Sequence, residues 1–176
     1  MSVVMKTHTE YDHAALVEMH KVTSQAVTAR ETLRKKAFYL TWGSCALGIG
    51  AFLALDGNLV LGCLLLAGGA FLMVRYLFFF PLMAWGTARN LSAAQKSGDY
   101  TFETYHILAR QGKDAARYPY DQCYALLETP GRFYFVTLNG QCLALDKGAL
   151  EGGSVSELRA LLERKTGKTA LAVKVK

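Results

Sequence analysis

Cysteine and histidine are the residue types in this chain that would hold a metal ion or act as nucleophile and base. The four cysteines lack the Cys-x-x-Cys spacing of a zinc site: Cys45, Cys63, Cys123 and Cys142. His13 and His20 stand seven residues apart, two helical turns, and no third ligand follows at three or four residues. We therefore expect no metal site, and a cytoplasmic location disfavours structural disulfides.

Carboxylates and hydroxyls show no catalytic pattern either. Asp114, Asp121 and Asp146 stand singly, and the sequence has no Gly-x-Ser-x-Gly or His-Glu-x-x-His motif. Gly167-Lys168-Thr169 resembles the end of a phosphate-binding loop, but Leu162 stands where the first glycine belongs and a predicted helix precedes it. We name no catalytic residue, no cofactor and no nucleic-acid partner, while a catalytic site assembled only in three dimensions stays open.

The composition concentrates apolar residues in two runs. The chain has 176 residues, of which 52% are hydrophobic and 19% charged, and a formal net charge of +6. Residues 37–55 contain no charged side chain, and residues 59–80 contain only Arg75. A helix needs about 20 apolar residues to cross a bilayer core. With the turn Asp56-Gly57-Asn58 between them, the runs predict a transmembrane hairpin over 37–80, with spans of about 37–55 and 59–80.

Basic residues flank this hairpin on one side. Arg30, Arg34, Lys35 and Lys36 precede the first span and Arg75 closes the second, whereas the turn contains no Lys or Arg. The positive-inside rule then places both termini in the cytoplasm. These five residues are candidate contacts for anionic lipids, or they serve only to set the topology.

A stripe of small residues runs along the first span. Ala46, Gly50 and Ala54 recur every four residues and would permit close approach of another helix. The second span of the same hairpin is the favoured neighbour, and a second copy of the chain is the alternative. Neither span has a buried acidic residue or a Gly or Pro break at its middle, which disfavours transport by this chain alone.

Polar segments with helical patterns lie on both sides of the hairpin. Residues 1–36 are expected to be a cytoplasmic N-terminal helical segment, because Thr7-His8-Thr9-Glu10 fits a capping box and apolar residues then continue at helical spacing. Residues 81–96 are expected to form a juxtamembrane helix.

Residues 97–176 show the alternating pattern of strands and predict a second folded unit. Thr129-Pro130-Gly131-Arg132 has the chemistry of a type II turn. Asn139-Gly140 predicts a two-residue hairpin turn that pairs Val136 with Leu143 and Tyr134 with Leu145.

A helix closes this unit. Ser154 and Glu157 form a capping box at its start, and Gly167 stands at its end. The fold class we expect is therefore an α+β membrane protein, with an N-terminal helix, a two-helix transmembrane hairpin and a small antiparallel β domain closed by a helix.

Scattered positions across the chain are shared with one family. They are Gly98-Asp99-Tyr100-Thr101-Phe102, Tyr118-Pro119-Tyr120-Asp121, Leu127-Glu128, Phe133-Tyr134-Phe135, Leu145-Asp146-Lys147-Gly148 and Glu157-Leu158-Arg159. With the two spans before them, they resemble the YcxB-like family of bacterial membrane proteins, although Asp146-Lys147 replaces the usual Pro-Lys pair. The resemblance implies a cytoplasmic pleckstrin-homology-like domain over 97–176 on a two-span anchor in the bacterial inner membrane, and it implies no established reaction.

These observations favour a membrane-anchored, non-enzymatic interaction module of unknown ligand. The lipid bilayer is its expected partner, and a protein partner or a second copy of the chain is a further one. A membrane enzyme or an accessory subunit of a transporter is the alternative. Two or more carboxylates, or His106, converging in a concave pocket would favour that alternative.

Overall fold

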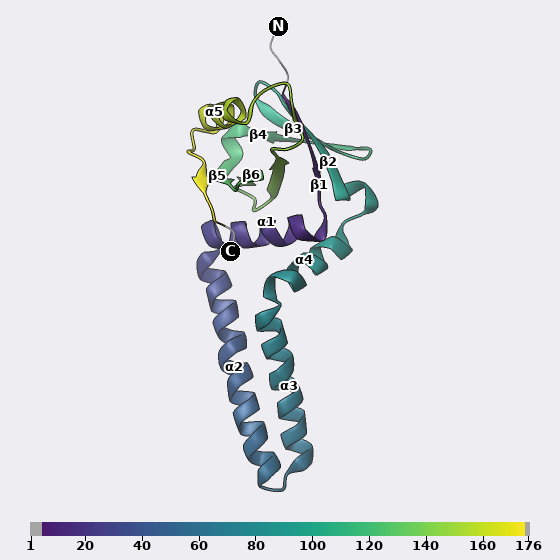
Figure 1. Ribbon diagram of the computed structural model, residues 1–176, viewed down its shortest axis with the longest axis vertical. Coiled ribbons are helices and arrows are strands. Elements are labelled where there is room, and N and C mark those ends of the chain that lie inside the picture. The colour runs from purple at the N-terminus through teal and green to yellow at the C-terminus, as the bar shows by residue number, and fades with distance from the viewer. Residues whose placement is uncertain (1–4, 175–176) are drawn as a thin grey trace. The chain divides into compact units, whose positions relative to one another are not determined.

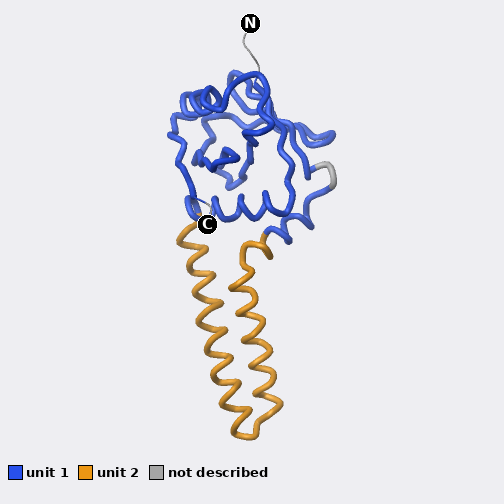
Figure 2. The backbone as a smooth tube through the Cα atoms, viewed as in Figure 1, with its two compact units in different colours: residues 1–27, 84–176 blue, residues 28–83 orange. Residues whose placement is uncertain are grey.

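The computed structural model describes residues 5–174, without the side chains of residues 93 and 94. The chain is mixed α+β and forms two compact units (Figure 2). The first unit comprises residues 1–27 and 84–176, and the second comprises residues 28–83. The second unit is therefore an insertion within the sequence of the first.

The second unit is an antiparallel helical hairpin. Its helices are α2 (Ala29–Leu55) and α3 (Leu59–Leu77), joined by a turn in which Gly57 takes a φ of +91°, a conformation that costs glycine little (Figure 1). Both helices are long and apolar enough to cross a membrane. Only 11% of the most apolar 18-residue window of each helix is buried, so the apolar side chains lie mainly on the surface of the hairpin.

Buried glycines set the contact between α2 and α3. They are Gly43 and Gly50 in α2, and Gly62 and Gly69 in α3. A Cβ atom on Gly62 would lie 2.8 Å from the backbone nitrogen of Ala54, and one on Gly50 would lie 2.9 Å from that of Leu66. Gly50 and Ala54, two members of the predicted stripe, thus lie between the two helices of one hairpin, and Ala46 is half-buried.

Pro81 determines where α3 stops. Proline lacks an N–H group, and its ring clashes with the carbonyl four residues earlier, which here is that of Leu77. A new helix, α4 (Phe79–Asn90), therefore begins after Phe78, with Pro81 in its first turn. The second apolar helix ends three residues before the predicted span does. A 3-10 turn, η1 (Ala93–Lys96), follows α4 in place of the end of the predicted juxtamembrane helix.

The first unit contains a five-stranded antiparallel sheet in the order β4-β3-β2-β1-β8 (Figure 1). Its strands are β1 (Lys6–Glu10), β2 (Ser97–Phe102), β3 (His106–Gln111), β4 (Asp114–Pro119) and β8 (Leu150–Glu151). Glu10 pairs with Ser97, so the strand before the insertion joins the strand that follows it.

This pairing corrects two expectations about residues 1–36. The predicted helical cap at Thr7–Glu10 is wrong, because Thr7 and Thr9 are buried while the residues between and beside them are exposed, which is the period of a strand. Residues 1–36 are also not a separate helical segment, since β1 belongs to the sheet of the first unit. The helix α1 (His13–Ala26) begins after Asp12, whose side chain accepts a hydrogen bond from the Ala15 N–H.

A second sheet has the order β7-β6-β5-β9. Its strands are β5 (Cys123–Glu128), β6 (Arg132–Thr137), β7 (Cys142–Asp146) and β9 (Leu171–Ala172). β9 runs parallel to β5, and the other pairs are antiparallel. A 3-10 turn, η2 (Tyr120–Gln122), leads into β5, and α5 (Val155–Thr166) precedes β9.

Both faces of the second sheet are buried. Phe133 and Phe135 on one face of β6 pack with residues of the first sheet and with Leu158 of α5. Tyr134 on the other face packs with Val22 of α1. Helix α1 thus covers the face of β6 that the predicted domain, lacking residues before 97, would leave in water.

Side chains of β1 and of the residue after it satisfy backbone groups of β7. The Thr7 hydroxyl donates to the Asp146 carbonyl, and the Asp146 N–H donates to Thr9 Oγ1 over 3.1 Å. The Ala144 N–H donates to the Tyr11 hydroxyl over 3.2 Å. β1 therefore joins the two sheets: its backbone pairs with β2 and β8 of the first sheet, and the side chains of Thr7, Thr9 and Tyr11 bond to β7 of the second.

Two predicted turns differ in the structure. Gly131 does not take a positive φ, so the turn after Thr129 is not of type II. After β6, the Thr137 N–H donates to the Gln141 carbonyl, and Gly140 has a φ of +78°. This is a three-residue loop with a glycine bulge, which shifts the register by one residue.

The register shift moves the predicted partners to opposite faces. Val136 pairs with Cys142 and Tyr134 with Ala144, whereas Leu143 and Leu145 pair with the two phenylalanines of β6. The predicted pairs of Val136 with Leu143 and Tyr134 with Leu145 are therefore wrong.

The predicted ends of the last helix are confirmed. Ser154 and Glu157 form a reciprocal capping box at the start of α5, and Gly167 closes it with a φ of +66°.

Candidate functional site

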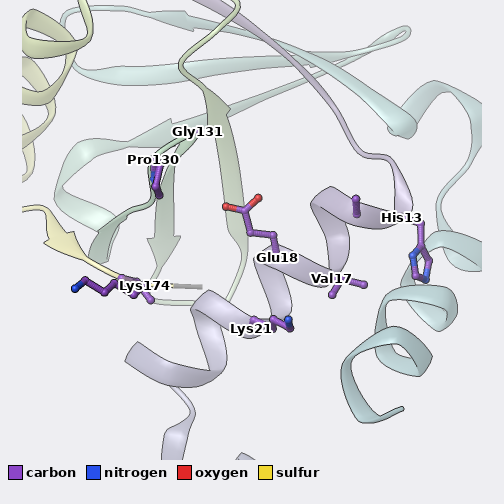
Figure 3. A pocket seen from close by; sticks show the side chains of 9 residues that line it. His13, Val17, Glu18, Lys21, Pro130, Gly131 and Lys174 are labelled. Carbon is purple, nitrogen blue, oxygen red and sulfur yellow. The ribbon is translucent and has the colours of Figure 1, made fainter. Parts of the chain in front are cut away.

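An open groove of about 870 Å³ lies between α1, the β5–β6 turn and the residues after β9 (Figure 3). Its lining residues are His13, Ala14, Val17, Glu18, Lys21, Pro130, Gly131, Val173 and Lys174. The five from α1 recur at three- and four-residue spacing and form one face of the helix. The opposite face of α1 is buried, so α1 both completes the core and forms one wall of the groove.

The carboxylate of Glu18 is held in place within the groove. Thr129 Oγ1 donates to Glu18 Oε1 and Arg132 Nη1 donates to Glu18 Oε2, each over 2.8 Å. Arg132 Nε lies 3.4 Å from Asp146 Oδ2. The hydroxyl of Tyr134 belongs to the same cluster, and burial raises the pKa of Tyr134 well above its ordinary value. The charge of Glu18 is thus compensated by Arg132.

A second cluster of charged side chains stabilises the β5–β6 turn. Lys147 Nζ lies 2.7 Å from Glu128 Oε1 and donates to the Thr129 carbonyl over 2.6 Å, while Arg159 donates to Glu128 Oε2. Burial alone would raise the pKa of Glu128, but the hydrogen bonds from Arg159 and Lys147 outweigh it and lower that pKa. Thr129 contacts both clusters, so the turn that forms one wall of the groove is fixed from two sides.

The groove combines apolar and charged groups. Ala14, Val17 and Val173 supply apolar surface, and Lys21 and Lys174 supply positive charge. The described residues that line the groove include no serine, threonine, cysteine or tyrosine. The groove volume lies in the range of small-molecule sites.

A smaller and more polar pocket of about 250 Å³ lies on the first sheet. His8 Nδ1 and Asp99 Oδ1 are 2.7 Å apart across β1 and β2, and Glu151 of β8 also lines the pocket. Register places Asp99 between His8 and Arg110. The carboxylates of Asp99 and Glu151 therefore line one concave surface, and Glu151 lies opposite Lys6 of β1. The same arrangement of opposite charges also occurs on the solvated faces of sheets.

The five predicted basic site residues all lie in the hairpin unit. Lys36 Nζ lies 4.3 Å from the ring centre of Phe80, and the guanidinium of Arg75 lies 5.5 Å from that of Tyr39. Lys35 forms an ion pair with Glu31, while Arg30 and Arg34 are exposed. The structure thus brings Lys36 and Arg75 onto aromatic rings of the hairpin and leaves Arg30 and Arg34 on its surface.

The predicted histidine and cysteine candidates are not brought together. His13 lines the groove, and His20 Nε2 lies 3.0 Å from Thr87 Oγ1, with its pKa lowered by burial. No group of three or more His, Cys, Asp or Glu side chains within the described residues could hold a metal ion. Burial raises the pKa of Cys123 to about 11 and that of Cys142 to about 12.

Sequence reasoning missed the groove. Glu18 and Arg132 stand 114 positions apart, and no motif or spacing connects them. The basic Lys147 is part of the family resemblance, and its pairing with Glu128 is visible only in the structure.

No family model matches this sequence, and a comparison with curated proteins found no match. The resemblance to the YcxB-like family therefore stays a prediction.

Proposed function

We propose that this protein is a membrane-anchored, non-enzymatic interaction module, in which the helical hairpin inserts into a bilayer and the first unit binds a ligand in the groove along α1. The observation that carries the proposal is the exposure of apolar side chains along both α2 and α3. Leu55 and Val60 are 90% and 79% exposed, and water is an unfavourable environment for such a surface.

The orientation and setting belong to the same proposal. Basic residues in the first eight positions of α2 and at the end of α3 favour a cytoplasmic location for both chain ends in a bacterial inner membrane. The two sheets and the closing helix α5 are consistent with a pleckstrin-homology-like domain of the YcxB-like kind. In this protein the strand β1 and the helix α1 would be part of that domain.

The groove supports binding over chemistry. Its carboxylate is held in place by Thr129 and Arg132, and its walls are held by two ion clusters. A fixed surface that combines apolar and basic groups recognises a ligand without reorganising, which lowers the entropic cost of binding.

Two measurements on the full chain test the proposal. The protein in its native membrane should resist extraction by alkaline carbonate, which releases proteins bound only to the membrane surface. A photoreactive phenylalanine analogue at Val17, inside the groove, should form an adduct with the ligand, whereas the same analogue at Gln25, an exposed position of α1 outside the groove, should not. Release by carbonate would refute the anchor, and equal adducts at both positions would refute the groove.

The polar pocket with His8 and Asp99 supports a second candidate, a membrane enzyme or an accessory subunit of a transporter. A histidine beside a carboxylate at 2.7 Å is the geometry of a general base and its orienting group. The purified protein would be assayed with p-nitrophenyl acetate and p-nitrophenyl phosphate. Hydrolysis that disappears in His8→Ala but persists in His13→Ala would favour this candidate, and equal rates in all three proteins would count against it.

A further inference from the structure

The basic residues in the first turns of α2 face two different ways. Lys36 and Tyr39 are half-buried, and both lie on the side of α2 that also carries Gly43, which is buried against α3. Arg34, Phe38 and Trp42 recur every four residues on another side and are all exposed. One face of α2 therefore packs within the hairpin, while the neighbouring face presents a positive charge followed by two aromatic rings.

A crevice of about 620 Å³ lies along this part of α2. Its lining includes Glu31, Arg34, Lys35 and Phe38, and further along the helix Tyr39 and Trp42. Lys35 is paired with Glu31 over 2.7 Å, and no carboxylate within the described residues lies within 4 Å of Arg34. The ring centres of Phe38 and Trp42 are 6.1 Å apart.

Along the helix the charged group is followed by the two aromatic rings, in the order of a phospholipid's headgroup and acyl chains. Arg34 and Trp42 are eight residues apart, about 12 Å along the helix axis. A headgroup phosphate at the guanidinium would leave its acyl chains running beside the two aromatic rings toward the exposed apolar residues that follow, such as Ile49. Tryptophan favours this boundary between the headgroups and the acyl chains.

We propose that this crevice is a binding site for an anionic phospholipid of the bilayer, with Arg34 as the headgroup contact and Phe38 and Trp42 as the acyl-chain contacts. The inference rests on the proposed membrane insertion of the hairpin. It assigns a lipid-binding role to Arg34, whereas Lys36 and Arg75, which lie over aromatic rings of the hairpin, stabilise the hairpin.

Tryptophan fluorescence tests the site, because the chain has only two tryptophans. The full chain with Trp85→Phe, which leaves Trp42 as the only reporter, would be reconstituted in phosphatidylcholine vesicles. Equal minor fractions of brominated phosphatidylglycerol or brominated phosphatidylcholine would then be added as quenchers. Quenching of Trp42 should be stronger with the anionic lipid, with a preference of about fivefold for one basic contact, and should weaken as salt is raised.

Arg34→Gln should abolish most of this preference, whereas Arg30→Gln, which removes the same charge one turn earlier and outside the crevice, should retain it. Equal losses in the two variants would show diffuse attraction and overturn the site. Equal quenching by both lipids in the parent protein would also overturn it while leaving membrane insertion intact. No quenching by either lipid would refute the insertion itself and the site with it.

Discussion

The first unit should not fold from residues 97–176 alone, although this segment has the appearance of a complete domain in the sequence. The fragment lacks β1, which lies between β2 and β8, and it lacks α1, which covers one face of the second sheet. We expect the isolated fragment to be unfolded in water, and we expect a chain that joins residues 1–27 to residues 84–176 through a flexible Gly/Ser linker to fold.

The magnitude follows from the buried contacts. Leu16 and Val22 of α1 are fully buried, and each such side chain contributes about 1.5–3 kcal/mol. The side chains of Thr7, Thr9 and Tyr11 make three hydrogen bonds to β7, each worth about 1 kcal/mol net. The loss of roughly 6–9 kcal/mol, before the ladder of β1 is counted, is comparable to the whole stability of a typical domain of about 5–15 kcal/mol.

The assay is urea unfolding followed by near-ultraviolet circular dichroism, with a two-dimensional NMR spectrum of each protein. The linked chain should show dispersed amide signals and one cooperative transition, and the linked chain with Leu16→Asp should show neither. A dispersed spectrum and cooperative unfolding of residues 97–176 alone would refute the reasoning, because the strand and helix from the N-terminal segment would then be dispensable.

Three further predictions concern single positions. Thr9→Val removes the buried hydroxyl that accepts the hydrogen bond of the Asp146 N–H and should destabilise the protein by about 1–3 kcal/mol, measured by thermal unfolding in detergent. Gly62→Leu should separate α2 from α3 and lower the unfolding temperature, whereas Gly68→Leu, where a side chain meets open space, should leave it unchanged. The pKa of Cys142 is raised to about 12, so iodoacetamide should modify this thiol at pH 8 only in urea, and the rate in the folded protein should rise as the pH approaches 12.

The sequence predicts the features of this structure that arise from local interactions. The turn at Asp56-Gly57-Asn58, the capping box of Ser154 and the end of α5 at Gly167 depend on residues a few positions apart. The apolar hairpin can be predicted for the same reason, because it is recognised by the length of two runs of apolar residues.

The features that the sequence does not predict depend on distant residues. Thr7–Glu10 fits both a helical cap and a strand, and its pairing with β2, far along the chain, decides between them. Asn139-Gly140 fits a two-residue turn, but the observed three-residue loop sets another register. In that register Phe133 and Phe135 of β6 pair with Leu145 and Leu143, and α1 covers the opposite face of β6. The groove has no local signal, because its charge pair joins Glu18 to Arg132.

The split arrangement of the first unit raises the cost of closing its sheet, and the hairpin reduces that cost. Glu10 and Ser97 are 87 positions apart, and each doubling of a flexible loop adds about 0.6 kcal/mol, so a loop of this length costs roughly 2–3 kcal/mol more than a short turn. Packing of α2 on α3 places Arg75 beside Tyr39, which shortens the flexible path between the two strands. Because the two strands can pair only after both apolar helices have been synthesised, and because the hairpin is built from local contacts, we infer that α2 and α3 pack first and that β1 then joins β2.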